Sequence, residues 1–424
     1  MFEVKNKSLL YQEVLDVMNQ IRDLESVSAV LGWDLETHMP DGAHEHRGDM
    51  ISAIDTFAHR ILTSAKTRDL ADKVRTNCSQ CCRVEEKMYD LFLEEFDRAA
   101  KIPDRLVMEV SRVRTTAQNS WKSALKKSNF KIFESDLEKL LDLKIEVAEC
   151  LGYDNDRYDA MLNIYEPGLT VDYLDSIFDE LRSATSELIE RVKASDRKID
   201  QGFFLMKYSQ NKQSKIARQI SRRIGFNYAY GRMDFSVHPF TTAFSPKDVR
   251  FTTRIKEHNL GYCFFSTIHE AGHAIYEQGI DYSLYRTFAA QASSYGIHES
   301  QSLIWENNIA RSVEFWEWAL PVLNLEFPHN LQNVTPGMAF RAVNKIRPSL
   351  IRTESDELTY NMHIILRYEI ERDLMNKRIR VADIPEIWRE KMLEYLGSEV
   401  SEDAKGALQD IHWAFGGIGY FPTY

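Results

Sequence analysis

Cysteine is scarce in this chain, with five residues among 424. So small and odd a set excludes a scaffold held together by disulfides, and it is typical of a reducing compartment. Cys78 and Cys81 form a CxxC pair beside Cys82, but no second pair with zinc-site spacing follows. We therefore expect no metal or redox role for these thiols, and we predict a cytoplasmic protein.

Long apolar runs are missing too. No stretch approaches the ~18 residues that a membrane span requires, and the first residues lack the apolar centre and cleavage site of a secretory signal. The 53 basic residues are outnumbered by 64 acidic ones, and the net charge of −11 gives no reason to expect a polyanion as ligand. We predict neither a membrane nor a nucleic-acid partner.

Repeats, low-complexity tracts and Gly/Ser-rich linkers are also absent, so nothing marks an internal domain boundary. What the sequence does contain is helical periodicity, first in the apolar stripe of Val14, Met18 and Ile21. Gly32 suits the end of that first helix. Further amphipathic stretches follow near residues 43–64, 80–99, 104–126, 134–150 and 171–194. We predict a single, mostly α-helical domain over residues 1–424.

One segment departs from the helical pattern. Between residues 231 and 255, β-branched and aromatic residues alternate with polar ones around turn signals. We expect a small antiparallel β-sheet there. Helical periodicity resumes near Leu260.

The sequence GYCFFSTIHEAGHAIYEQG, residues 261–279, predicts a helix that ends at Gly279. His269 and His273 are four residues apart, so both imidazoles project from one face of this helix and can bind one metal ion. Glu270 can then reach a water on the metal without being a ligand, and we assign it as the general base. The chemistry indicated is metal-assisted amide hydrolysis.

A catalytic zinc needs a third protein ligand. The next helix begins near His298, and its first acidic residues, Glu299 and Glu306, are seven apart and so on one face. Spacing does not choose between these two carboxylates, and His298 is a further alternative.

Two other groups of residues are candidate substrate contacts. Residues 346–360, IRPSLIRTESDELTY, concentrate charges around Arg352, and a helix start capped by Ser355 or Asp356 is the plain structural interpretation. The expected sheet region supplies His238 and Arg250.

The chain resembles the carboxypeptidase Taq family of helical metallopeptidases, and five patterns of that family occur in order. They are HPF at 238–240, DxRxT at Asp248, Arg250 and Thr252, HExxH at 269–273, HESQ at 298–301, and IRxxSDE at Ile351, Arg352, Ser355, Asp356 and Glu357. The segments GWDLETHMP, YDAMLNIYEPG and QDIHWAFGGIGYFPTY are similar as well.

The resemblance implies that the metal ligands are His269, His273 and Glu299, with Glu270 as general base. It also implies two helical lobes flanking a deep groove, a homodimer, and release of single residues from the C-termini of peptides. Members of the family continue for several tens of residues beyond the FPTY pattern, so we expect that their C-terminal helical segment is lacking here.

Our prediction is a metallocarboxypeptidase with one divalent ion per chain, zinc above cobalt or manganese. A phenol near such a metal can stabilise an oxyanion, which makes Tyr420 a candidate substrate contact, although a packed aromatic in a turn is the plainer interpretation. An oligopeptidase or dipeptidyl carboxypeptidase of similar helical fold is the alternative enzyme. From another class, a zinc-stabilised scaffold without activity would need a fourth ligand and would leave Glu270 without a role.

Overall fold

The computed structural model describes residues 8–77 and 82–424, so Cys78 and Cys81 lie outside the described residues. Cys82 and Cys150 are free thiols. None of the described helices is both long and apolar enough to cross a membrane.

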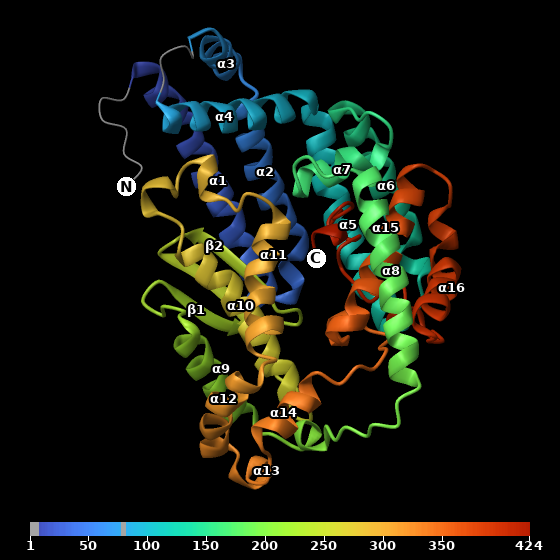
Figure 1. Ribbon diagram of the computed structural model, residues 1–424. Coiled ribbons are helices and arrows are strands. Elements are labelled where there is room, and N and C mark those ends of the chain that lie inside the picture. The colour runs from blue at the N-terminus through green and yellow to red at the C-terminus, as the bar shows by residue number, and fades with distance from the viewer. Residues whose placement is uncertain (1–7, 78–81) are drawn as a thin grey trace. The chain divides into compact units, whose positions relative to one another are not determined.

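Helices dominate the described chain (Figure 1), which confirms the predicted fold class. The α-helices are α1 (Leu9–Thr37), α2 (His44–Leu62), α3 (Ala65–Asn77), α4 (Arg83–Lys101), α5 (Asp104–Lys127), α6 (Lys131–Leu151), α7 (Arg157–Tyr165), α8 (Val171–Lys193), α9 (Gln210–Ile224), α10 (Leu260–Gln278), α11 (Tyr295–Leu303), α12 (Val313–Glu326), α13 (Pro328–Leu331), α14 (Pro336–Val343), α15 (Glu357–Met375) and α16 (Ile384–Leu396). A π-helical segment, Ile304–Ile309, continues α11.

The chain divides into two compact units. Unit 1 comprises the described residues up to Arg112 together with Ser221–Arg254 and Glu270–Ser293. Unit 2 comprises Val113–Ile220, Ile255–His269 and Ser294–Tyr424, so that α5, α9 and α10 contribute to both units. The single domain over residues 1–424 stays a prediction.

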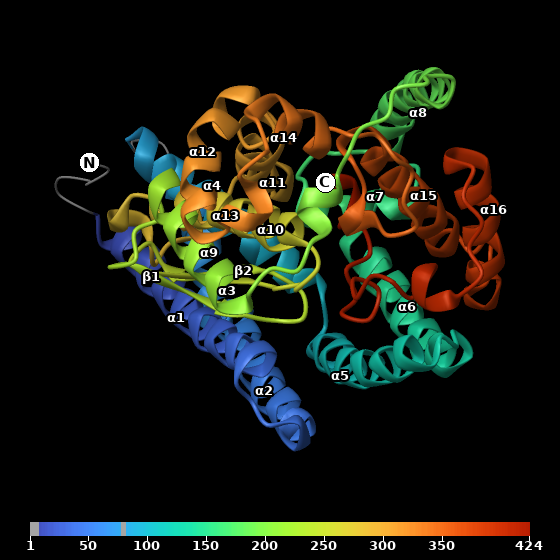
Figure 2. The same ribbon diagram turned by 90° about the horizontal axis from the view of Figure 1, so that it is seen from below.

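In unit 1, α1 packs along α2 and also contacts α3 and α4 (Figure 2). The predicted apolar stripe of α1 is buried. Val14 and Met18 are completely inaccessible, in a cluster that also holds Phe92 of α4. Burial of this stripe explains why the segment is helical, since periodic apolar side chains gain most by facing one core.

The C-terminal end of α1 differs from the prediction. Our expectation that Gly32 ends this helix is wrong, because α1 continues to Thr37. The extra residues bury Trp33 against the ring of Phe240, with the centroids 5.2 Å apart. A distant aromatic contact therefore outweighs the local preference of glycine for a helix end.

A three-stranded sheet lies in the predicted segment, and its strands β1 (Gly231–Phe235), β2 (Thr241–Ser245) and β3 (Asp248–Thr253) are in the order β1-β3-β2. The β2–β3 pair is antiparallel, as expected, but β1 pairs with β3 in parallel. The sheet is therefore mixed and not wholly antiparallel. The reason is that the chain reverses direction between β1 and β2 and again between β2 and β3, so β1 and the central strand β3 run the same way.

In unit 2, α15 is the central helix and packs against α6, α7, α8 and α16. Asp356 is its N-cap and accepts two backbone N–H groups of the first turn at 3.0 Å each, so of the two predicted caps the structure has Asp356. Further along α15, the polar side chains of His363, Arg367 and Glu371 are completely buried. Burial of such groups is costly unless other polar groups in the unit satisfy them.

Candidate metal centre

Helix α10 carries the HEAGH residues as predicted. It ends at Gln278, and the N–H of Gly279 donates to the carbonyl of Ile275. Apolar positions on this helix, such as Ile268 and Ala271, are completely buried. Their burial fixes the helix and so fixes the directions in which its two imidazoles project.

The structure brings His269, His273 and Glu299 together. One possible ligand atom from each lies within 4.8 Å of the others. The Nε2 atom of His269 is 3.6 Å from Oε1 of Glu299, close to the ~3.4 Å expected between two ligands about 2.1 Å from a tetrahedral ion. Two imidazoles and one carboxylate are ligand types that zinc accepts, so the residues fit a divalent metal. His298, the histidine alternative, is partly buried and is not a member of this group of ligand atoms.

Glu306, the rival third ligand, lies on the other side of the same imidazole. Its Oε2 atom is 2.8 Å from Nδ1 of His269, and its Oε1 atom accepts a long hydrogen bond from Arg311 at 3.4 Å. Burial raises the pKa of the Glu306 carboxyl, but the hydrogen bond and charge of His269 and the charge of Arg311 outweigh burial and hold this pKa below its ordinary value. Glu306 is therefore a carboxylate in the folded protein.

Glu270 is buried, with 7% of its surface exposed. The hydroxyl of Thr241, the first residue of β2, lies 2.7 Å from Oε2 of Glu270 and 2.9 Å from its carbonyl oxygen. This contact within unit 1 restricts the orientation of the carboxylate.

Arg352 is almost inaccessible, with 5% of its surface exposed. Its Nε and Nη2 atoms donate to Oδ1 of Asp410 at 3.1 and 2.9 Å, and its Nη1 donates to the hydroxyl of Tyr360 at 2.6 Å. Arg367 donates to the other oxygen of Asp410, through Nε at 2.8 Å and through Nη2. Burial and the two nearby guanidinium groups lower the pKa of the His363 imidazole to about 3. Two buried guanidinium groups thus share one carboxylate, beside a neutral histidine.

Arg250 has a different environment. Its Nε and Nη2 atoms donate to the two oxygens of Asp248 at 2.8 Å each, and its guanidinium lies 4.8 Å from the centre of the Phe244 ring. Its charge is therefore balanced by one carboxylate. His238, in the bend after β1, is exposed.

Tyr420 lies among aromatic rings. The centroids of Tyr165, Tyr295 and Tyr424 are 5.3, 5.4 and 5.4 Å from its own. Burial raises the pKa of the Tyr420 phenol, and the negative charge of Glu299 raises it further, so the hydroxyl stays protonated and able to donate. The ring is packed, as the plainer interpretation expected, yet it lies close enough to Glu299 for that charge to affect its pKa.

Glu371 of α15 holds the segment that carries Tyr420. It accepts the Tyr158 hydroxyl at 2.6 Å, the Trp413 indole N–H at 2.7 Å and the Gly419 backbone N–H at 2.9 Å. Burial outweighs these three hydrogen bonds and raises the pKa of this carboxyl to about 7.

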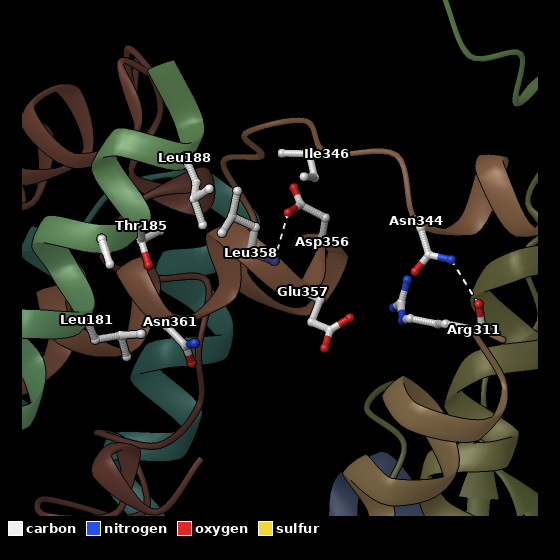
Figure 3. Close-up of a pocket in the computed structure, with 11 residues that line it drawn as sticks. Leu181, Thr185, Leu188, Arg311, Asn344, Ile346, Asp356, Glu357, Leu358 and Asn361 are labelled. Carbon is white, nitrogen blue, oxygen red and sulfur yellow. Dashed lines mark hydrogen bonds between the residues drawn. The ribbon is translucent and has the colours of Figure 1, made fainter. Parts of the chain in front are cut away.

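A pocket of about 500 Å³ lies in unit 2 (Figure 3). Leu188 of α8 lies on one side of it and Arg311 and Asn344 on the other, and Glu357 projects between them. Arg311 therefore borders this pocket and also donates to Glu306.

Sequence reasoning missed several of these residues. Thr241, Arg311, Arg367 and Glu371 carry no local signal, because each is a common residue type in an ordinary helix, strand or loop. Asp410 stands in the QDIHW segment that resembles the family, and that resemblance was its one signal.

A helical fold with a histidine pair, a nearby carboxylate and a second buried carboxylate on the histidine helix is that of a metallopeptidase. The model of the carboxypeptidase Taq (M32) metallopeptidases matches residues 13–424, and the chain belongs to this family.

Individual relatives agree. Carboxypeptidase 1 of Bacillus subtilis is 37% identical over 413 residues, which cover 97% of this chain and 82% of that protein. The structure of Pyrococcus furiosus carboxypeptidase matches with a TM-score of 0.93 and 35% identity over 100% of this chain and 85% of that one. The M32 carboxypeptidase from Deinococcus radiodurans R1 matches with a TM-score of 0.92 and 34% identity over 98% and 84%.

The chain is accordingly a metal-dependent carboxypeptidase that acts on peptides, which confirms the main prediction. Membership also favours this function over the two alternatives, the oligopeptidase and the scaffold without activity.

Proposed function

We propose that His269, His273 and Glu299 hold one zinc ion and that Glu270 is the general base of peptide hydrolysis. The observation that carries this proposal is the cluster of three ligand atoms within 4.8 Å of one another. Cobalt and manganese accept the same ligand types. When bound, such an ion polarises the scissile carbonyl and acidifies water.

In this proposal Glu270 takes the proton of the attacking water and passes it to the leaving amine. It follows His269 directly on α10, and the Thr241 hydroxyl orients its carboxylate. The Tyr420 phenol, protonated and close to Glu299, donates a hydrogen bond to the developing oxyanion.

Arg352 is our proposed partner for the terminal carboxylate of the substrate. It shares Asp410 with Arg367, so the three side chains together carry one more positive than negative charge, which an anion would balance. The ring of Tyr424 lies 4.6 Å from the Arg352 guanidinium, and the charge of Glu299 contributes, after burial, to the raised pKa of this phenol. That influence supports a position of Arg352 near the proposed metal ligands.

Arg250, the other candidate, already forms a paired hydrogen bond with Asp248. We propose that this arginine braces the sheet and contacts substrate only through its remaining N–H groups. For His238 we propose only a contact with bound peptide, since its exposure leaves it accessible. Replacement of Arg250 and of Arg352 should therefore have different consequences.

The family resemblance is the basis on which we also propose a homodimer, which sedimentation analysis would test. The small number of cysteines, and the free thiols of Cys82 and Cys150, support a cytoplasmic location.

The experiment compares one peptide with a free C-terminus and the same peptide amidated, using metal-loaded protein and mass spectrometry of the products. Stepwise loss of single residues from the free peptide alone supports the proposal. Arg352→Met should lower kcat/KM about 30- to 1000-fold, because it removes a desolvated charge contact, whereas Arg250→Met should cost less. Equal cleavage of the amidated peptide would refute the proposal that the enzyme recognises the terminal carboxylate of its substrate.

The general base has its own test. Glu270→Gln keeps the shape of the side chain but accepts no proton, so the rate should fall about 100-fold or more. Metal content should stay near one ion per chain. His269→Ala and Glu299→Ala should instead lose metal, and retention of metal by both would refute the ligand assignment.

A further inference from the structure

The imidazole of His269 lies between two carboxylates. Its Nδ1 atom is 2.8 Å from Oε2 of Glu306, and its Nε2 atom is 3.6 Å from Oε1 of Glu299. The first distance is that of a strong hydrogen bond and the second is too long for one. The two nitrogens of one ring therefore have different partners at different distances.

This geometry defines where the ring proton resides. A neutral imidazole has one N–H and one lone pair. A carboxylate only accepts, so the hydrogen bond to Glu306 requires the proton on Nδ1. The lone pair of Nε2 then points toward Glu299, another acceptor. A cation between them satisfies both: a proton on Nε2 in the metal-free protein, or a metal ion that has His269 and Glu299 as ligands.

The position of Glu306 is itself held by its surroundings. Glu306 lies in the π-helical segment Ile304–Ile309, and such segments are frequent at functional sites. Arg311 donates to Oε1 of Glu306 at 3.4 Å and also to the carbonyl of Val343. Its guanidinium lies 4.8 Å from the centre of the Phe265 ring, one turn before the first ligand histidine on α10. Arg311 is thus held by a backbone carbonyl and an aromatic ring in addition to the carboxylate that it contacts.

We propose that Glu306 is a positioning residue which, braced by Arg311, keeps the proton of His269 on Nδ1 and strengthens Nε2 as a metal ligand. This inference rests on the proposed function, because it takes His269 as a ligand. An anion that accepts a hydrogen bond from Nδ1–H makes Nε2 of the imidazole a stronger ligand for the metal and prevents the ring from flipping. Glu299 and Glu306 thus have different roles, one at the metal and one behind a ligand.

Metal affinity of the metal-free protein is the first readout, measured by competition with a chromogenic chelator for zinc. Glu306→Gln retains an oxygen that can accept a hydrogen bond from Nδ1–H but loses the negative charge. Glu306→Leu loses both the acceptor and the charge. We expect zinc to bind about 10- to 100-fold more weakly to these variants than to the wild type, with the larger loss in Glu306→Leu. Glu317→Gln is the matched control, because Glu317 is an exposed carboxylate of α12, and its affinity should be unchanged.

The second readout is the tautomer of His269, from long-range ¹⁵N NMR of the metal-free protein labelled at histidine, with His269→Ala to assign the signal. At a pH high enough for the ring to be neutral, we expect the Nδ1–H form in the wild type and a mixture of forms in Glu306→Leu. This measurement needs no activity. It also preserves the test if Glu306→Leu fails to fold, since the wild-type tautomer and Glu306→Gln remain.

Different outcomes distinguish this inference from the proposed function. If His269→Ala and Glu299→Ala bind zinc as tightly as the wild type does, the proposed metal site is wrong. If those variants lose zinc while Glu306→Gln and Glu306→Leu bind it normally, the assignment of the ligands is supported and the proposed role of Glu306 is wrong. An Nε2–H tautomer in the wild type would likewise refute the role of Glu306.

Discussion

Replacing Asp410 with asparagine should destabilise unit 2 strongly. Asp410 is the carboxylate shared by Arg352 and Arg367, and the side chains of Asp410, Arg352 and Arg367 are only 11%, 6% and 0% exposed. Asparagine has nearly the same shape but no charge, so two buried guanidinium groups would be left without a counter-ion. Breaking a buried ion pair in this way costs about 3–5 kcal/mol, or roughly a 10²- to 10⁴-fold change in the unfolding constant.

The assay is denaturant unfolding followed by tryptophan fluorescence. The Arg367 guanidinium lies over the ring of Trp388, 4.5 Å from its centre, so this indole reports on the cluster. Asp179→Asn is the control, because Asp179 is an exposed carboxylate that pairs with Arg182 on the surface of α8, and the free energy of unfolding should change by less than about 1 kcal/mol. A loss below about 1 kcal/mol in Asp410→Asn, the range of a surface pair, would refute the reasoning.

The pH dependence provides a second check. Burial raises the pKa of Asp410, but the charges of Arg367 and Arg352 outweigh it and hold this pKa well below its ordinary range. A carboxyl whose pKa is lower in the folded than in the unfolded state stabilises the protein above the unfolded pKa of about 4 and loses that contribution as the pH falls below it. The wild type should therefore lose this stability below about pH 4, and Asp410→Asn should lack this component.

Three further predictions concern other buried contacts. Burial raises the pKa of the Glu371 carboxyl to about 7. The protonated carboxyl therefore contributes its full stabilisation below about pH 4.5, and the free energy of unfolding falls by about 3 kcal/mol as the pH rises to about 7. Glu371→Gln should remove this dependence in denaturant unfolding at pH 5 and 8, and a wild type equally stable at both would contradict it. Thr241→Val removes the hydroxyl 2.7 Å from Oε2 of Glu270, so kcat should fall about 10- to 100-fold with little change in KM. Thr241→Ser keeps the hydroxyl and should keep activity. Equal kcat in the two variants would show that this hydroxyl does not orient Glu270. Gly419 has φ +89°, and a Cβ there would lie 2.7 Å from the carbonyl carbon of Met161, so Gly419→Ala should lower the unfolding midpoint, and a normal midpoint would show that the loop adapts.

Elements with strong local periodicity could be predicted from the sequence. The stripe of Val14 and Met18 is buried as expected, and the HEAGH helix ends where Gly279 indicated. Local cues failed where distant contacts decide. Gly32 permits a helix end, yet burial of Trp33 continues α1. The parallel pairing of β1 with β3 likewise depends on β3 lying between the two other strands, and alternation within each strand does not encode this order.

The candidate arginines show why charge has to be counted in three dimensions. Arg250 has its carboxylate two residues away, at Asp248, so its sequence neighbourhood already contains the balancing charge. Arg352 has acidic neighbours in sequence as well, yet Asp356 is occupied as the cap of α15. The actual partner of Arg352 is Asp410, which is 58 positions away in the sequence.

Counted along the sequence, the segment around Arg352 has more acidic than basic residues, so the positive charge of Arg352 would already be balanced. The folded cluster instead has an excess of one positive charge, because Arg367 occupies the other oxygen of Asp410. Recognition of a substrate carboxylate needs such an excess, since a guanidinium that is fully balanced gains little from a second anion. Arg367 is thus the residue that leaves Arg352 able to bind an anion. Arg367→Met should consequently raise KM for peptides with a free C-terminus, and Arg367→Lys, which keeps the charge, should restore most of the loss. Equal KM values in the two variants would show that the charge of Arg367 has no part in recognition and that its role is only structural.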